Sequence, residues 1–528
     1  MTERMSGSLE HIMGREKEIV AAEKFPLPDA YIEKLLDYGL EAHADAYRLV
    51  VELVDAIGKK GGLALLIGGS VRDVLFGKIS KDFDLEVYGL EASQIAEIVK
   101  EHGKVDEVGA AFGILKLFAG KGLDIDVSLP RTDSKIGEGH RGFEVKTNPH
   151  MSIADAALRR DFTMNTIAAN PLTGEIFDAH GGVKDILARR LKITDPELFA
   201  DDPLRILRGM QFVGRFGLEI DAESVDIMRQ MVPRLREIPA ERFLEEWKKL
   251  FLKSEKPSLG LSAATTLGVM RELYPQFIEI EKSEGLTEGG GVDSWIHTMA
   301  AVDEAAKIIR RDKLDSDNAF ILMLATFCGN LTHGHESGGR ESVKSEAVEL
   351  AKAEKFLASI KADNKVRDKV LALIASRHVP AKLYLDDQIR EKAVSDGQIR
   401  RLAKQIHPAT IQELALLAEA VHLGWGAFGD SETRADLMMP KDSFEAREWL
   451  IERAHLIGVI DAKPADLIQG RDLKTFGYKP GKEFGQLIKL ANDLRDERGF
   501  MAEEVFAALD GVSDVRLAVS KLEELLNG

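Results

Sequence analysis

Hydrophobic and polar residues follow two different spacings along this chain, and the change between them divides it into two kinds of structure. Between Leu63 and about Thr194, short apolar runs show the signals of β-strands, whereas nearly every segment after Asp195 has helical spacing. Residues 1–60 also have helical spacing, which ends at the glycines of 58–62. The pattern predicts an α+β protein: a head with a small mixed β-sheet, followed by a long all-helical neck, body and tail.

Glycine and proline residues, which interrupt regular structure, indicate where the individual strands, helices and domains begin and end. Strands are expected at 63–67, 83–89, 112–120 and 123–129, with a helix at 92–102 between the second and the third. The predicted parts are an N-terminal helical extension at 1–60, a head at 61–195, a neck at 196–255, a body at 256–390 and a tail at 391–528.

The composition limits the possible partners. The chain has 528 residues, of which 45% are hydrophobic and 30% charged, which is a globular composition sufficient for several domains. Its 71 basic and 88 acidic residues give a net charge of −17, so a polyanion must meet a local basic face. The single cysteine, Cys328, excludes an internal disulfide, and no run of 18 apolar residues occurs. These features predict a soluble, cytoplasmic protein with no membrane partner.

A pair of glycines, Gly68 and Gly69, lies between the first predicted strand and a short helix. Because glycines lack side chains, backbone N–H groups and a helix N-terminus can approach a phosphate there. A strand followed by two glycines is also typical of an ordinary turn, so the pair alone does not identify a phosphate site.

Two carboxylates follow thirteen residues after the glycine pair. Asp82 and Asp84 flank Phe83, and residues two apart in a strand face the same side of a sheet. Asp124 and Asp126 share a face of a later predicted strand in the same way. Neighbouring carboxylates repel one another, and Mg²⁺ offsets that repulsion. Three converging carboxylates can hold two such ions for nucleotidyl transfer. Either pair alone, without the glycine pair, is more typical of a solvated strand edge.

Further motifs show which family this arrangement resembles. GGSVRD at 68–73 followed by DFD at 82–84 resembles the signature of class II tRNA nucleotidyltransferases, the CCA-adding enzymes, and of the related bacterial poly(A) polymerases in the polymerase-β superfamily. The other motifs of that family are matched by RRDFTMN at 159–165, FDAHGGVKDILARRL at 177–191, DDPLRILRGMQFVGRFG at 201–217 and PAERFLEEWKKL at 239–250. One departure is Asp201, where the family usually has glutamate; the carboxylate is kept on a shorter arm.

The resemblance implies roles for residues of the head. Asp82 and Asp84 are expected to bind Mg²⁺, and Asp126 is expected to be the third catalytic carboxylate. The nucleotide-binding residues that the resemblance implies are Gly68, Gly69 and Arg72 for the triphosphate, Arg160 and Asp161 for the shape of the nucleotide site, and Asn165 for the sugar.

The resemblance also implies that Asp202 and Arg205 choose the base without a template, with Arg208 on the same side. Residues three apart stay near one face of a helix. Arginine offers a fixed fork of donors and aspartate offers acceptors, so they can complement base edges or each other. A structural explanation stays open, because Asp202 before Pro203 is a typical helix start and both arginines fit a helix surface.

The body contains an incomplete second resemblance. Segments 295–308, 325–334 and 375–380 resemble a metal-dependent HD phosphohydrolase domain that is fused to some relatives. Where that domain has an adjacent His-Asp pair, this chain has Gly329 and Asn330, which are poor metal ligands. We therefore predict no phosphohydrolase metal in the body. His297 and His378 are expected to be packing or surface groups, and weak metal binding in the His-rich loop at 332–335 is an alternative.

These features predict an enzyme that adds C, C and A to tRNA 3′ ends from CTP and ATP with Mg²⁺. A poly(A) polymerase, or an enzyme that adds only CC or only A, has the same head motifs and remains an alternative. The stretch 135–158 resembles the flexible loop of complete CCA-adding enzymes. A non-catalytic RNA-binding protein is disfavoured because all three carboxylates are present. The tail resembles the tRNA-binding C-terminal region of the family, with basic residues at Arg471, Lys474, Lys479, Lys482 and Lys489.

Overall fold

The computed structural model describes residues 24–80, 82–106, 114–120, 123–135, 143–277, 294–329, 340–426, 439–440 and 442–528. The chain divides into two compact units. The first comprises Met1–Leu250 and Leu259–Leu273, and the second comprises Phe251–Ser258 and Tyr274–Gly528.

The β-strands belong to the first unit. Its main strands are β1 (Leu63–Ile67), β2 (Phe83–Tyr88), β3 (Val105–Asp106), β4 (Ile114–Gly120), β5 (Leu123–Ser128), β8 (Ala168–Ala169) and β9 (Ile176–Phe177). They form one sheet in the order β3-β4-β5-β2-β1-β8-β9. Strands β2 and β5 pair in parallel and the other neighbours pair antiparallel, which confirms the predicted small mixed sheet.

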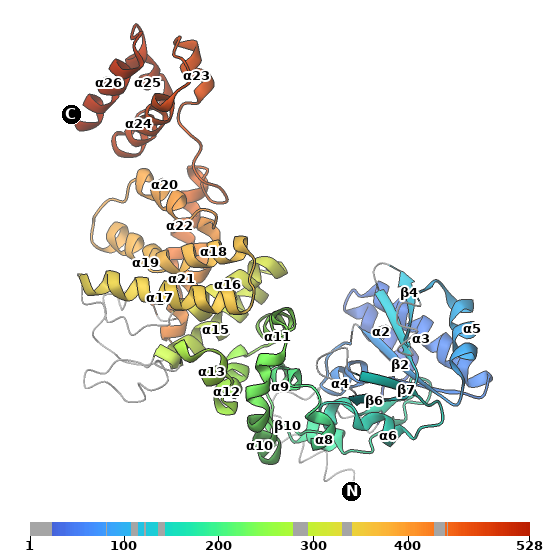
Figure 1. Cartoon of the computed structure of the whole chain (residues 1–528). Helices are drawn as coiled ribbons and strands as arrows, with labels where there is room; N and C mark the ends of the chain where they lie inside the picture. The colour runs from blue at the N-terminus through green and yellow to red at the C-terminus, as the bar shows by residue number, and fades with distance from the viewer. Residues whose placement is uncertain are drawn as a thin grey trace. The chain divides into compact units, whose positions relative to one another are not determined.

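Helices cover one face of this sheet because alternate residues of its strands are apolar. Helix α3 (Glu41–Lys59) contacts β1, β4 and β5, and α5 (Ala92–His102) contacts β4 (Figure 1). The side chains that fill this layer are fully or almost fully buried, among them Phe83, Leu85, Leu117, Ile125 and Val127. On β2 and β5 the opposite face carries the acidic residues Asp84, Glu86, Asp124 and Asp126.

The described part of the N-terminal extension belongs to this layer. Helix α2 (Pro28–Asp37) packs on α3, and the ring of Tyr47 lies between those of Tyr31 and Phe83, with centroids 4.7 and 5.4 Å away. Residues 24–60 thus pack directly against the strand that carries the predicted metal ligands.

The segment 131–158 is more regular than a flexible loop. Strands β6 (Arg131–Lys135) and β7 (Phe143–Thr147) form an antiparallel hairpin, and α6 (Ile153–Leu158) begins at Ser152, whose hydroxyl accepts the N–H of Asp155. The loop predicted for 135–158 is therefore corrected to a strand and a helix, while residues 136–142 lie outside the described part.

The first unit also contains short helices, some of which lie between the strands of the sheet. These are α4 (Gly69–Leu75), the 3-10 turn η2 (Thr163–Asn165), α7 (Gly182–Leu187), α8 (Pro196–Phe199), α9 (Leu204–Phe216), α10 (Ala222–Met231), η3 (Val232–Glu237), α11 (Ala240–Lys253), α12 (Pro257–Leu267) and α13 (Val269–Leu273), with a small pair β10 (Arg190–Leu191) and β11 (Glu219–Ile220). Gly209 lets α9 pack closely, because a Cβ there would lie 2.7 Å from Cε of Met228 and 3.1 Å from Cζ of Phe162.

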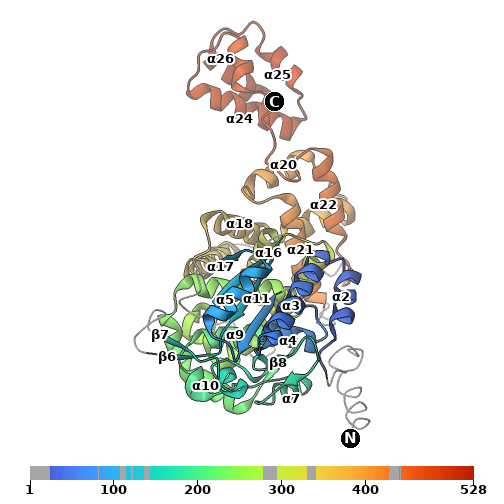
Figure 2. The same cartoon turned by 90° about the vertical axis from the view of Figure 1, so that its right-hand side faces the viewer.

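The second unit is helical throughout its described residues. Its elements are η4 (Pro275–Phe277), α15 (Ser294–Arg311), α16 (Ser316–Cys328), α17 (Arg340–Ser359), α18 (Asn364–Ser376), α19 (Val379–Tyr384), η5 (Leu385–Ile389), α20 (Asp396–Gln405), α21 (Ile411–Gly426), α22 (Glu445–Leu456), α23 (Gly470–Thr475), α24 (Lys482–Arg498), α25 (Ala502–Leu509) and α26 (Val515–Asn527). The last four surround a hydrophobic core of their own, which includes Leu473, Leu487, Leu494, Val505 and Leu522. Figure 2 shows three of these helices, α24, α25 and α26, packed together. Within the described ranges, the helices are all too short or too polar to cross a lipid bilayer.

Candidate active site

The carboxylates of the two predicted strands lie side by side on the polar face of the sheet. Asp84 on β2 is paired directly with Asp126 on β5, and Asp126 is paired in turn with Lys116 on β4. Residues paired in this way project from the same face. Asp82 lies two residues before Asp84, at the end where β2 begins. The sheet thus confirms the prediction that a neighbouring strand brings a carboxylate beside the first two.

The predicted convergence of all three carboxylates on one point is wrong. Across the residues that the structure describes, no three His, Cys, Asp or Glu side chains gather closely enough to hold a metal ion. The arrangement is a neighbouring pair, Asp84 and Asp126, with Asp82 at its edge.

This pair has the chemistry that suits a hard divalent cation. Burial raises the pKa of Asp84 to about 6, and the negative charges of Asp126 and Asp82 add to the effect. Oδ1 of Asp126 is covered and accepts no hydrogen bond from the described residues, although Lys116 Nζ lies 3.5 Å away from it. Clustered carboxylate oxygens with unmet charge and hydrogen-bonding capacity are ligands that Mg²⁺ accepts.

The glycine turn is tied directly to this strand. Gly68 has a φ of 61° and a ψ of −123°, a backbone conformation that favours glycine. A Cβ at this position would meet no atom within 4 Å, so lack of space is not the reason for the glycine. The next residue but one, Ser70, is buried and its hydroxyl accepts the N–H of Asp84 at 3.0 Å. Ser70 was not singled out from the sequence, although it stands inside the first motif.

A tyrosine from the N-terminal extension supports the loop before Asp82. The hydroxyl of Tyr31 donates to the carbonyl of Ser80 at 3.3 Å and accepts the Ser80 N–H at 3.1 Å. The Ser80 hydroxyl in turn donates to the carbonyl of Asp82 at 2.9 Å.

Replacing Tyr31 with phenylalanine is expected to lower the free energy of unfolding by about 1–3 kcal/mol, because two buried backbone groups of Ser80 lose their partner. Thermal unfolding measures this change. Tyr38→Phe is the matched control, since Tyr38 is 62% exposed, and its melting temperature should stay within about 1 °C of the native value. Equal melting temperatures for the two variants would contradict the assigned support.

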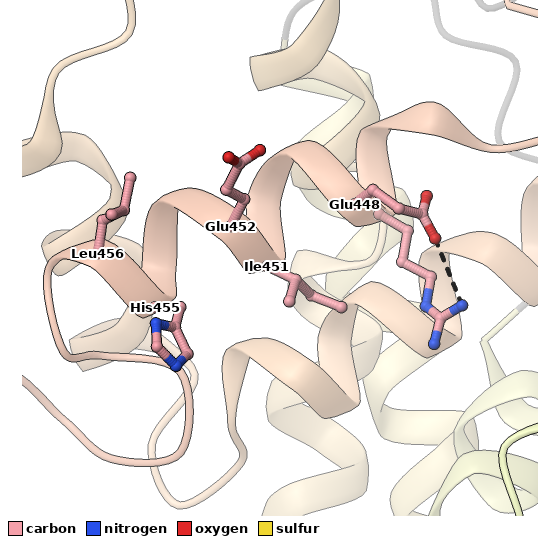
Figure 3. Close-up of a pocket in the computed structure, with 6 residues that line it drawn as sticks. Glu448, Ile451, Glu452, His455 and Leu456 are labelled. Carbon is pink, nitrogen blue, oxygen red and sulfur yellow. Dashed lines mark ion pairs between the residues drawn. The ribbon is translucent and has the colours of Figure 1, made fainter.

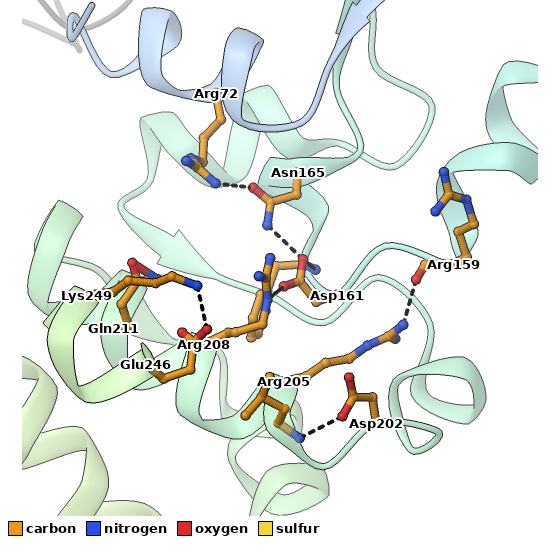
Figure 4. A network of polar contacts seen from close by, with 12 residues as sticks. Arg72, Arg159, Asp161, Asn165, Asp202, Arg205, Arg208, Gln211, Glu246 and Lys249 are labelled. Atoms are coloured by element: carbon orange, nitrogen blue, oxygen red, sulfur yellow. Dashed lines mark hydrogen bonds and ion pairs between the residues drawn. The ribbon is translucent and has the colours of Figure 1, made fainter. Parts of the chain in front are cut away.

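A chain of polar contacts joins α4 to α9 (Figure 4). Nη1 of Arg72 donates to Oδ1 of Asn165 at 2.7 Å, and Nδ2 of Asn165 donates to Oδ1 of Asp161 at 2.7 Å. Nε of Arg208 completes the chain by donating to Oδ2 of Asp161 at 2.6 Å. Four predicted nucleotide-site residues, Arg72, Asp161, Asn165 and Arg208, therefore form one connected group.

Arg72 is more enclosed than its predicted role requires. Its side chain is buried, its guanidinium lies 5.0 Å from the ring centroids of Phe212 and Phe216, and Nε donates to Asp73 at 2.8 Å. In this structure Arg72 connects α4 to α9 and is not an open phosphate ligand.

Asp161 is the centre of the chain. Burial by itself raises the pKa of this carboxyl, but the charge of Arg208 and the hydrogen bonds from Asn165 and Arg208 outweigh burial and hold the pKa below its ordinary value. The same pairing raises the pKa of the Arg208 guanidinium, chiefly through the charge of Asp161. Both groups are therefore charged at neutral pH.

The predicted base-reading residues have structural partners as well. Asp202 accepts the N–H of Leu204 at 3.1 Å, so the explanation of Asp202 as a helix start is observed, and it also accepts Nη2 of Arg242 at 3.0 Å. Arg205 donates to the carbonyls of Leu198 and Arg159 at 2.9 and 2.7 Å. Arg242 lies on α11, within the fifth motif, and its pairing with Asp202 was not predicted.

A buried glutamate was also missed. Glu86 shares the face of Asp84 by strand alternation and is 1% exposed. Its carboxylate accepts from Arg159 at 3.0 Å, from Arg160 at 3.2 Å and from the hydroxyl of Tyr88 at 2.7 Å. Arg160, predicted to shape the nucleotide site, is thus held against β2 by Glu86. The alternation of Asp84 and Glu86 in the sequence FDLEVY could have indicated that Glu86 lies on the same face as Asp84.

The degenerate phosphohydrolase region lies in the second unit. His297 is buried, stacks on Trp425 with centroids 3.8 Å apart, and has Nε2 3.0 Å from the carbonyl of Val421. A Cβ at Gly329 would lie 2.7 Å from the carbonyl oxygen of Ala325. Asn330 and the run 332–335 lie outside the described residues, and the absence of a metal here stays a prediction.

A shallow pocket on α22 in the same unit holds none of the predicted site residues (Figure 3). It is lined by Arg447, Glu448, Ile451, Glu452, His455 and Leu456, and Arg447 and Glu448 form an ion pair at 3.5 Å.

Comparison with known proteins identifies the family. Residues 64–192 match the family described as "Poly A polymerase head domain", and residues 217–280 match "Probable RNA and SrmB- binding site of polymerase A". A "Multifunctional CCA protein" of Xanthomonas oryzae pv. oryzae is 30% identical over 364 residues, which cover 67% of this chain and 83% of that protein. The chain belongs to the family of class II CCA-adding enzymes and bacterial poly(A) polymerases. A second relative in this family, the "Multifunctional CCA protein" of Xanthomonas campestris pv. campestris, is 33% identical over 258 residues, and this chain spans 60% of its length.

Solved structures of CCA-adding enzymes share the fold. The Bacillus stearothermophilus CCA-adding enzyme in complex with CTP matches with a TM-score of 0.60 at 20% identity, covering 88% of this chain and 96% of that one. The Thermotoga maritima CCA-adding enzyme complexed with tRNA matches with a TM-score of 0.54 at 20% identity, covering 93% of this chain and all of that one.

Proposed function

We propose that this protein is a cytoplasmic, Mg²⁺-dependent nucleotidyltransferase that adds C, C and A to tRNA 3′ ends from CTP and ATP. The observation that supports this most strongly is the pairing of Asp84 with Asp126 on adjacent parallel strands, in the head that defines the family. The relatives named for CCA addition extend the same proposal to the substrates.

The proposed reaction is an in-line displacement. The 3′-hydroxyl oxygen of the tRNA attacks the α-phosphorus of the nucleotide and forms a phosphodiester bond. The bond from that phosphorus to the oxygen of the β-phosphate breaks, and pyrophosphate leaves with its electron pair. Asp126 takes the hydroxyl proton and passes it to water.

Asp82 and Asp84 are the proposed Mg²⁺ ligands, with Asp126 beside them. When bound, the ion would lower the pKa of the attacking hydroxyl and neutralise phosphate charge. The protein itself supplies position: Ser70 fixes the backbone of Asp84, and Gly68 and Gly69 leave the backbone uncovered for the triphosphate. Arg160, Asp161 and Asn165 shape the nucleotide site from the connected group, with Arg72 holding Asn165 in place.

Base choice is proposed to lie with Asp202 and Arg205, which are fixed at the start of α9. The two backbone carbonyls hold the guanidinium of Arg205 in one orientation, and Arg242 holds the carboxylate of Asp202. A fixed fork of donors beside a fixed pair of acceptors can select base edges without a template. Arg208 supports them through Asp161.

Arg205→Ala is expected to reduce the preference between CTP and ATP about tenfold, because the fixed donors are lost. Affinity for tRNA should change less than this ratio does. Steady-state incorporation of each nucleotide into a tRNA ending in CC measures the effect. Arg229→Ala is the control. Arg229, on α10, also donates to a backbone carbonyl, that of Thr266 on α12. An unchanged nucleotide ratio in Arg205→Ala would remove the base-reading role.

The parts of the chain have proposed roles in the same reaction. Residues 61–195 are the catalytic head, 196–255 the neck that selects the nucleotide, 256–390 the body without a phosphohydrolase metal, and 391–528 the tail that binds tRNA. The match of residues 217–280 to an RNA-binding family element supports RNA contact in the neck and at the start of the body.

Incubation of the purified protein with tRNA ending at the discriminator base tests the proposal. With CTP alone, two nucleotides should be added, and ATP should then add one more. Long adenosine tails would instead show a poly(A) polymerase, and arrest after CC or the need for a CC end would show a partial enzyme. Release of no pyrophosphate with any nucleotide would overturn the proposed function.

A further inference from the structure

One strand of the polar face carries an exposed aromatic residue among charged ones. The strand register sets Lys116 opposite Asp126 and Phe118 opposite Asp124, so Phe118 lies on the face of the catalytic carboxylates, one row further along. On this face β5 carries Asp124, Asp126 and Ser128, and β2 carries Asp84. Phe118 is 40% exposed, although strand alternation would favour a polar residue there.

One lysine lies against this ring, and a second follows on the same face of the sheet. Nζ of Lys104 lies 5.6 Å from the centroid of Phe118, and the Phe118 N–H donates to the Lys104 carbonyl at 3.0 Å, which fixes the two residues together. Lys116 lies two residues away on the same face, with its ammonium between Asp126 and Asp124 at 3.5 and 3.8 Å. An exposed ring with cations beside it is the combination that binds unpaired nucleotides, by stacking on the base and pairing with the phosphates.

The distance to the reacting group matches a nucleotide near the end of a strand. Diagonal neighbours on paired strands are about 7–8 Å apart, which is the separation expected between Phe118 and Asp126. Stacked bases are about 3.4 Å apart, so the ring is about two stacking steps from the carboxylate at which the hydroxyl reacts.

We propose that Phe118, together with Lys104 and Lys116, forms a stacking platform for an unpaired base close to the 3′ end of the RNA acceptor. This rests on the proposed function, because the RNA end must reach Asp126 and Asp84. The ring receives the base, Lys104 neutralises a backbone phosphate, and Lys116 offsets the acids beside which the RNA passes.

The test compares Phe118→Ala with Phe118→Tyr in the full-length protein. Loss of one stacked base is expected to raise the KM for a tRNA ending in CC about tenfold, while kcat and the KM for ATP stay within about twofold. Phe118→Tyr keeps the ring and should restore the native KM. Leu36→Ala, at a side chain that is also 40% exposed, is the matched control and should leave both constants unchanged. An unchanged KM for tRNA, or a rise in the KM for ATP instead, would overturn the platform.

A binding measurement separates this proposal from the proposed function. Fluorescence anisotropy of a labelled RNA minihelix ending in CC, without nucleotide, should show about tenfold weaker binding to Phe118→Ala than to the native protein. For Lys104→Ala, the salt dependence of binding should fall by the amount expected for about one phosphate contact. If the native protein transfers no nucleotide but Phe118→Ala still weakens binding, the proposed function fails and the platform stands. If transfer proceeds and Phe118→Ala binds as tightly as the native protein, the platform alone fails.

Discussion

Asp84→Asn is expected to reduce incorporation of both CTP and ATP into tRNA by about 10³-fold or more, because it removes the charge of a proposed metal ligand that lies directly opposite Asp126. Amide oxygen carries no net charge, so the variant binds a divalent cation far more weakly than the carboxylate does. Single-turnover incorporation at saturating nucleotide measures the loss. Asp226→Asn, at an exposed acid on α10 whose ion pair with Arg229 spans 3.8 Å, is the control and should retain native rates.

The same variant is expected to be more stable than the native protein, and this separates loss of chemistry from loss of folding. Because the pKa of Asp84 rises from 3.8 to about 6 on folding, the folded state binds this proton more tightly than the unfolded state does. The stability that this protonation provides is complete below pH 3.8 and is lost as the pH rises through 6. At pH 7 the charged carboxylate therefore lowers the free energy of unfolding by about 3 kcal/mol, and asparagine should regain on the order of 2 kcal/mol.

Thermal unfolding at pH 7 without divalent ions checks this sign, with a higher melting temperature expected for Asp84→Asn. Added Mg²⁺ should raise the melting temperature of the native protein and leave that of the variant nearly unchanged. A variant that is inactive and also less stable than the native protein would mean that Asp84 is mainly structural.

Asp161→Asn is expected to lower the free energy of unfolding by about 2–3 kcal/mol, the largest stability loss among these variants. Asp161 is 6% exposed and pairs with Arg208, whose charge would be left without a partner in an enclosed site. The figure is below that for a fully buried pair because the Arg208 side chain is 36% exposed. Urea unfolding measures the loss, and activity should fall as well, since Asn165 loses its acceptor.

The control for this variant is Asp45→Asn. Asp45 also pairs with an arginine, Arg48 at 2.6 Å, but both side chains are about half exposed, so the change should stay within about 0.5 kcal/mol. The pKa of Asp161 is held low in the folded state, so its contribution is present above the unfolded carboxyl pKa and is lost only as the pH falls below about 4. Equal unfolding free energies for Asp161→Asn and the native protein at pH 7 would contradict the central role of this pair.

The parts of the site that follow strand alternation could be predicted from the sequence. The strands at 63–67 and 83–88 and the helix at 92–102 occur where the pattern indicates. The two-residue spacing of Asp124 and Asp126 predicted their common face of β5, and Asp126 lies opposite Asp84. The register that sets these two residues directly opposite each other depends on long-range pairing of β2 with β5. No local pattern specifies which strands become neighbours.

The roles of the arginines were harder to predict, because a guanidinium fits a ligand and a buried carboxylate equally well. Arg72 and Arg160 stand inside motifs, yet their donors go to Asn165 and Glu86. Tyr31 had no signal at all, since its contact with Ser80 spans 49 residues and depends on how α2 packs. These contacts are tertiary, and only the folded arrangement shows which of several compatible partners each side chain takes.

The most direct measurement of the central claim is single-turnover transfer of one radiolabelled cytidylate from CTP to a tRNA ending at its discriminator base, with Mg²⁺, by the native protein and by Asp84→Asn. We expect rapid addition with one pyrophosphate released per cytidylate for the native protein, and at least a 10³-fold slower reaction for a folded variant. Comparable rates for the two proteins, or no transfer by the native protein, would contradict the central claim.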